Sequence, residues 1–162
     1  MQLHLLRHAE AEDTSSTGRD ADRELTESGR KRMQALARAI ASLDPQYDAI
    51  LVSPYLRARQ TAEPVAEVCG FDGELTQTAA LLPSAHPEDV LHEVAAMSCQ
   101  SVLLVGHQPH IGRLFGRLMT GRSNLEVPMK KAALAAFESS DRRFGSPELK
   151  FYLPPRILET LG

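Results

Sequence analysis

The sequence predicts an α/β fold with a mostly parallel central sheet and an antiparallel edge. Short apolar runs at 2–6, 49–52 and 101–105 are typical of strands, and the segments between them carry apolar residues at helical spacing. Two further strand-like runs follow one another near the C-terminus, which indicates a hairpin at the edge of the sheet. The 162 residues contain no repeat or linker and suit a single domain spanning 1–162.

The first strand and the first helix are separated by a polar segment. Residues 11–23 are rich in Asp, Ser, Thr and Gly without any periodicity, which predicts a loop. Thr26 is a suitable N-cap for the helix that follows. The inner face of this helix is expected to carry apolar residues spaced at three and four, namely Met33, Leu36, Ala37, Ile40 and Leu43.

The middle of the chain continues the alternation. After the strand at 49–52, Pro54 suits the first turn of a helix that runs to about Cys69. A short edge strand is expected over 74–78 and a helix over 87–97. The apolar run at 101–105 is typical of a strand buried on both faces.

The last third contains one more helix and the hairpin. Pro109 is expected to begin a helix that ends before Gly121. Residues 131–138 and 148–153 are predicted strands, joined by turn residues.

Composition argues against several classes of protein. The net charge of −3 gives no basic field for nucleic acid or an anionic membrane, and no apolar stretch is long enough for a membrane span. Cys69 and Cys99 stand alone, so we expect small buried residues rather than zinc ligands. The N-terminus has no basic segment followed by a long apolar one, which favours a cytoplasmic protein. We expect neither a metal nor another cofactor.

Three predicted strands are followed by side chains that suit a phosphoryl group. Arg7 and His8 end the first strand, Arg57 lies in the first turn after the second, and His107 follows the strand at 101–105. Taken singly, each histidine could be structural and Arg57 could make a surface ion pair. Open α/β sheets, however, bind ligands at the carboxyl ends of their strands. A neutral imidazole can attack phosphorus, and one guanidinium group can bind two phosphate oxygens at once.

These motifs resemble the histidine phosphatase superfamily, which also includes the cofactor-dependent phosphoglycerate mutases. The resemblance rests on Leu6-Arg7-His8-Ala9, the segment 53–61 that begins Ser53-Pro54, and Val105-Gly106-His107. The short chain and the sequence Arg23-Glu24-Leu25-Thr26, with Gly29 after it, are most similar to the small bacterial SixA branch of phosphohistidine phosphatases. The resemblance spans nearly the whole chain and implies a three-layer α/β/α sandwich without a metal.

The resemblance also implies a role for each matching residue. His8 would be the nucleophile that carries the phosphoryl group, and Arg7, Arg57 and His107 would line the phosphate pocket. Arg23 would be a further substrate-binding cation. Two positions depart from the family pattern: Ala9 stands where glycine is usual, and Glu24 stands where proline is frequent.

A carboxylate that serves larger members as general acid has no evident counterpart here, because Leu82-Pro83-Ser84-Ala85 occupies the corresponding region, with Glu88 and Asp89 following it. An alkoxide leaving group needs such an acid, whereas an imidazole can leave already protonated. The sequence therefore favours a phosphohistidine-bearing protein as substrate over a small phosphorylated metabolite. Two alternatives remain: a phosphatase of small phosphate esters, and a phosphate-binding module without turnover.

Overall fold

A six-stranded sheet in the order β3-β2-β4-β1-β5-β6 forms the centre of the molecule. The structure is a computed structural model that describes residues 1–161. The strands are β1 (Gln2–Arg7), β2 (Ala49–Val52), β3 (Leu75–Gln77), β4 (Ser101–Gly106), β5 (Leu134–Glu138) and β6 (Glu148–Leu153). The first four run parallel, whereas β5 pairs antiparallel with both β1 and β6. The predicted fold class and its antiparallel edge are confirmed.

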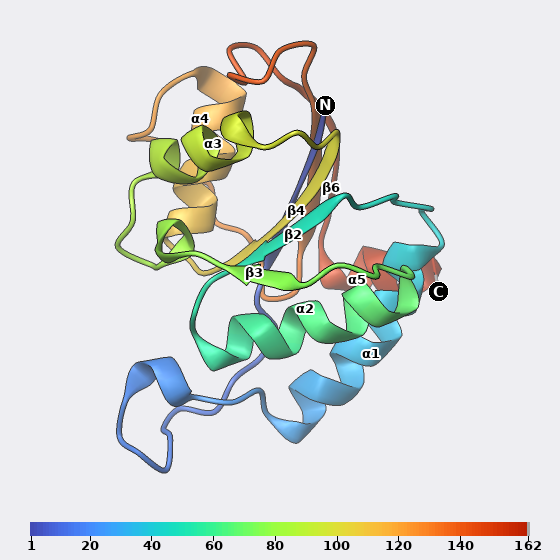
Figure 1. Cartoon of the computed structure of the whole chain (residues 1–162). Coiled ribbons are helices and arrows are strands. Elements are labelled where there is room, and N and C mark those ends of the chain that lie inside the picture. Colours follow the sequence, from blue (N-terminus) through green and yellow to red (C-terminus); the bar gives the residue numbers. More distant parts are fainter. Residues whose placement is uncertain (162) are drawn as a thin grey trace.

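Helices cover both faces of this sheet, as Figure 1 shows. They are α1 (Glu27–Ala41), α2 (Leu56–Val68), α3 (Pro87–Ala96), α4 (His110–Thr120) and the short α5 (Pro155–Leu158). Alternate residues of each strand enter separate cores: Leu3 and Leu5 pack on the side of α3 and α4, and Leu6 packs on the side of α1, α2 and α5. Strands buried on both faces explain why the central runs are continuously apolar.

Four helix boundaries test the predicted starts and ends of the helices. The Thr26 side chain accepts a hydrogen bond from the Gly29 backbone N–H at 2.9 Å, which confirms it as the N-cap of α1. The prediction for Leu43 was wrong, because α1 ends at Ala41 and Leu43 lies beyond it with 37% of its surface exposed. Pro54 precedes α2 by two residues, and Pro109 is the N-cap of α4. Both helices therefore begin slightly later than predicted.

Two further expectations concern burial and length. Cys99 is buried as predicted, but Cys69 is only half-buried because it is the C-cap at the end of α2. Within residues 1–161, no helix combines the length and apolar character needed to cross a membrane.

Strand register brings the predicted functional residues to one edge of the sheet. Arg7 at the end of β1 pairs with Gly106 of β4, and Val52 at the end of β2 pairs with Val105. The residues that follow these strands are therefore neighbours, although they are far apart in the sequence.

Candidate active site

His8 and His107 lie side by side at the carboxyl ends of β1 and β4. The His8 backbone N–H donates to the Gly106 carbonyl at 3.0 Å, which extends the β1–β4 pairing by one residue. The centroids of the His8 and His107 rings are 4.9 Å apart. Ser53, the residue after β2, joins the group, and its N–H donates to the Val105 carbonyl at 3.0 Å.

The His8 ring is held with one nitrogen engaged. Its Nδ1 lies 2.7 Å from the Ala9 carbonyl oxygen, so Nδ1 carries a proton and donates it. Nε2 makes no hydrogen bond within the described residues 1–161 and is left as the basic nitrogen. Ala9 does not have a positive φ, so its methyl group is accommodated where the family has glycine.

Burial keeps His8 neutral. Only 8% of the residue is exposed. Desolvation lowers the pKa of His8 to about 3, and the positive charges of Arg57, Arg7 and Lys131 contribute to the decrease, against the opposing effect of the hydrogen bond to Ala9. A neutral imidazole at pH 7 has an unprotonated nitrogen available for attack on an electrophile.

His107 is anchored by Ser53. Its Nε2 lies 2.7 Å from the Ser53 Oγ, whereas Nδ1 is buried without a partner. A Ser53 hydroxyl that donates to Nε2 leaves the ring proton on Nδ1, the nitrogen free to donate to an added group. Burial lowers the pKa of His107 to about 2, and the neighbouring His8 and Arg57 add to this effect. The ring is therefore neutral at pH 7.

Arg57 is a buried cation in the first turn of α2. It is 5% exposed, and its Cζ lies 4.8 Å from the centre of the Tyr55 ring. The Thr61 hydroxyl donates to the Arg57 carbonyl at 2.7 Å and accepts from the Ala9 backbone N–H at 3.0 Å. Thr61 thereby ties the start of α2 to the segment that follows His8.

Both arms of the Arg57 guanidinium are occupied by Asp20, from the loop between β1 and α1. Nη1 donates to the Asp20 carbonyl at 2.7 Å, and Nη2 donates to its carboxylate at 2.9 Å. The carboxylate also accepts from Arg23 Nη1 at 2.8 Å. Burial raises the pKa of the Asp20 carboxyl, but the hydrogen bonds from Arg23 and Arg57 outweigh it and hold the pKa below its usual value.

Asp20 is the site residue that the sequence analysis missed. Its carboxylate bridges two cations, which is the arrangement that a phosphoryl group would adopt between them. The available signal was its position three residues before Arg23. In a loop with several other acidic residues, that spacing did not distinguish it.

Arg23 and Arg7 lie at the margins of the group. Arg23 reaches it through Asp20, and its Nε donates to the Glu12 carbonyl at 2.5 Å. Glu24, in place of the family's proline, pairs outward with Arg30. Arg7 Nη1 donates to the Met129 carbonyl at 2.5 Å. Its Nε is buried without a partner.

Neither acidic candidate from the sequence joins the site. Glu88 makes an ion pair with Arg117 of α4 and accepts from the Ser123 hydroxyl at 3.3 Å. The Asp89 carboxylate accepts from the His86 backbone N–H at 3.3 Å, in the capping box of α3. The Asp20 carboxylate does act on the His107 imidazole and raises its pKa against the larger effect of burial.

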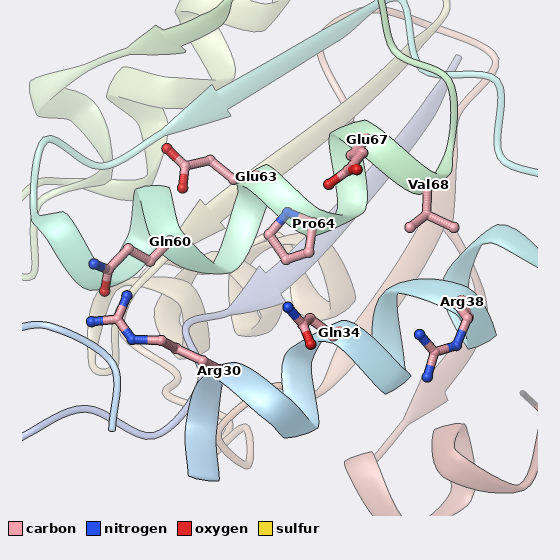
Figure 2. A pocket seen from close by; sticks show the side chains of 8 residues that line it. All are labelled: Arg30, Gln34, Arg38, Gln60, Glu63, Pro64, Glu67 and Val68. Atoms are coloured by element: carbon pink, nitrogen blue, oxygen red, sulfur yellow. The ribbon is translucent and has the colours of Figure 1, made fainter. Parts of the chain in front are cut away.

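A separate hollow lies between α1 and α2, away from these residues (Figure 2). Its volume is about 420 Å³. Its lining comprises Arg30, Gln34, Arg38, Gln60, Glu63, Pro64, Glu67 and Val68. The lining contains two arginines from α1 and two glutamates from α2, so the hollow has no marked preference for an anion. It contains none of the predicted site residues.

Known proteins are similar to this chain in both sequence and architecture. Residues 3–82 match the family described as the histidine phosphatase superfamily (branch 1). Phosphohistidine phosphatase SixA of Escherichia coli (strain K12) is 30% identical over 130 residues, covering 76% of this chain and 77% of that protein. A SixA homologue of Haemophilus influenzae is 31% identical over 135 residues, covering 76% and 80% of the two chains.

The structure of the protein histidine phosphatase SixA complexed with tungstate superposes with a TM-score of 0.85 at 25% identity, covering 96% of this chain and 98% of that one. Sequence motifs, fold and relatives agree. The chain belongs to the histidine phosphatase superfamily, in its SixA-type branch.

Proposed function

We propose that this protein is a metal-independent phosphatase that hydrolyses phosphohistidine on a partner protein through a phosphorylated His8. The observation that carries the proposal is the pairing of a neutral, buried His8, whose Nε2 is unengaged, with cations that suit phosphate oxygens. In this proposal Arg7 and Arg57 bind the oxygens of the phosphoryl group, Arg23 supports them, and His107 donates to it from Nδ1.

In the first step, His8 Nε2 attacks phosphorus in line with the P–N bond of the substrate. The new bond forms between Nε2 and phosphorus as the substrate's P–N bond breaks. A substrate imidazole already protonated on its other nitrogen departs as a neutral ring. The positive charge that develops on His8 is stabilised because Nδ1–H donates to the Ala9 carbonyl.

In the second step, water attacks the phosphorus of phospho-His8. The Nε2–P bond breaks, inorganic phosphate forms, and the His8 ring returns to its neutral state with the proton still on Nδ1. Catalysis in both steps depends on positioning and on the electrostatic stabilisation of phosphoryl oxygens.

The absence of a suitable acid among residues 1–161 supports a P–N substrate. An ester needs a protonated group beside its leaving oxygen. Asp20 is the carboxylate near the site, but its pKa is held below the usual value by Arg23 and Arg57, so it is ionised at pH 7. Glu88 is engaged with Arg117, which lowers its pKa despite partial burial.

The test compares the wild-type protein with His8→Ala on a phosphohistidine protein and on a panel of phosphate esters, with EDTA present. We expect rapid loss of phosphohistidine that requires His8, together with slow hydrolysis of the esters. An acid-labile, alkali-stable phosphoenzyme should be trapped with wild type and be missing with His8→Ala. His92→Ala, at an exposed position of α3, is the matched histidine control and should behave as wild type.

Two outcomes would overturn the proposal. Faster turnover of one ester than of phosphohistidine, lost in Glu88→Gln or Asp89→Asn, would identify an ester phosphatase with a general acid. Phosphate or vanadate binding without any His8-dependent turnover would identify a binding module.

A further inference from the structure

A strongly basic cavity opens at the same edge of the sheet as the candidate active site. Its volume is about 570 Å³. Its lining consists of five cationic residues and two prolines, namely Arg7, Arg32, Lys130, Lys131, Arg156, Pro154 and Pro155. The chain as a whole carries a net charge of −3, so this concentration of positive charge is local.

Strand pairing explains why the cavity adjoins the active site. Leu6 of β1 pairs with Leu134 of β5, which pairs with Leu153 of β6. Because β6 runs parallel to β1, both strands end at one edge of the sheet, and the residues after Leu153 lie near those that follow Leu6. Arg7 is common to the cavity and the candidate site.

The backbone that carries the two lysines is held in place. The Ala133 N–H donates to the Lys130 carbonyl at 3.0 Å, and the Ala132 N–H donates to the Arg7 carbonyl at 3.0 Å. The Lys130 N–H donates to the Tyr152 hydroxyl at 3.2 Å. These hydrogen bonds connect the turn that contains Lys130 and Lys131 to both β1 and β6. The backbone from which the two lysine side chains extend is therefore fixed in position.

Most of this positive charge is not neutralised by the protein. Lys131 lies 3.7 Å from Glu10, and Arg32 pairs with Glu159 at 2.6 Å. Within residues 1–161, the other three cations of the lining have no acidic partner, namely Arg7, Lys130 and Arg156. Arg7 Nε is in addition buried without a hydrogen-bond acceptor. This N–H is therefore available to donate to an anion.

We propose that this cavity is a second anion subsite, which binds a carboxylate or phosphate group that the substrate carries in addition to the phosphoryl group transferred to His8. The inference rests on the proposed function, because it places a second part of the same substrate. It assigns to the substrate at least two anionic groups, one at His8 and one over the cavity. On the proposed phosphoprotein substrate the second group is an acidic side chain, whereas a second phosphate of a small molecule takes that place only in the ester alternative.

The kinetic test removes two cations that are not part of the candidate catalytic group, in a Lys130→Ala/Arg156→Ala double variant. Substrates are used in matched pairs. One pair is a phosphohistidine peptide flanked by glutamates and the same peptide flanked by glutamines; the other is a sugar bisphosphate and the corresponding monophosphate. We expect the KM of the doubly anionic member to rise about fivefold to tenfold at low salt. The value of kcat, and the KM of the singly anionic member, should stay unchanged.

The control variant is Arg122→Ala/Arg143→Ala, which removes the same charge from exposed positions outside the cavity. It should leave every KM as in wild type. The pair that responds to the cavity variant identifies the source of the second anion. Equal effects of the two double variants, or no effect on either pair, would overturn the inference.

Anion binding tests the cavity without turnover. By calorimetry at low salt, tripolyphosphate should bind wild type about tenfold more tightly than orthophosphate does, and the cavity variant should lose that difference. If no substrate is hydrolysed but this difference is found, the proposed function fails and the subsite stands. Equal affinities for the two anions in wild type would overturn the subsite.

Discussion

Four buried histidines should make this protein lose stability as the pH falls from 7 to about 5.5. Burial lowers the pKa of His4 and of His110 to about 4, that of His8 to about 3 and that of His107 to about 2. In the unfolded chain each imidazole returns to its ordinary pKa of about 6.5. Below that pH the unfolded state binds protons that the folded state does not, so the free energy of unfolding decreases as the pH falls.

The size of the effect follows from these values. Between pH 7 and about 5.5, each histidine with a folded pKa near 4 or lower should reduce the free energy of unfolding by about 1.2 kcal/mol. Four such groups give a total of about 5 kcal/mol, which is comparable with the whole stability of a small domain. Most carboxyl groups titrate below this range, so the histidines dominate the change.

Urea denaturation at constant ionic strength measures this dependence, followed by far-ultraviolet circular dichroism because the chain has no tryptophan. A His4→Gln variant, at a position whose Nδ1 lies 2.9 Å from the Tyr47 hydroxyl, should lose about a quarter of the pH dependence, whatever its effect on stability at pH 7. The exposed His92→Gln control should keep all of it. A wild-type free energy of unfolding that changes by less than about 1 kcal/mol over this range would refute the reasoning.

Three substitutions test the candidate active site and the packing of the loop beside it. Asp20→Asn removes the anion that occupies Arg57, so tungstate should bind about tenfold more tightly by calorimetry; weaker binding would mean that Asp20 mainly positions Arg57. Ser53→Ala releases the His107 ring, so kcat should fall about tenfold to a hundredfold with little change in KM, and an unchanged kcat would contradict the role of Ser53. Gly29→Ala places a methyl carbon 2.3 Å from a backbone carbonyl oxygen of the preceding loop. This substitution should lower the free energy of unfolding by about 1–3 kcal/mol in urea denaturation. A variant as stable as wild type would show that the loop moves to accommodate the methyl group.

The spacing of apolar residues was sufficient to predict the helices and strands, because each of these elements depends on local chemistry. Continuous apolar runs predicted β2 and β4, which are buried on both faces, and Thr26 predicted the start of α1 through its cap. The errors lie at element ends. Leu43 continues the apolar spacing of α1, but the helix ends at Ala41. Apolar spacing alone does not indicate the residue at which a helix ends.

The identities of His8, Arg57 and His107 could likewise be proposed from sequence, because each follows or begins an element in a fold that collects strand ends at one edge. Asp20 could not be proposed in this way. It comes from an aperiodic loop, and its importance arises from a contact with a residue 37 positions away. The basic cavity has the same origin, since β-pairing brings residues 130–131 and 154–156 beside Arg7. The sequence by itself determined which chemistry was available at the strand ends, whereas tertiary structure decided which charges meet, because pairing between distant segments leaves no local pattern.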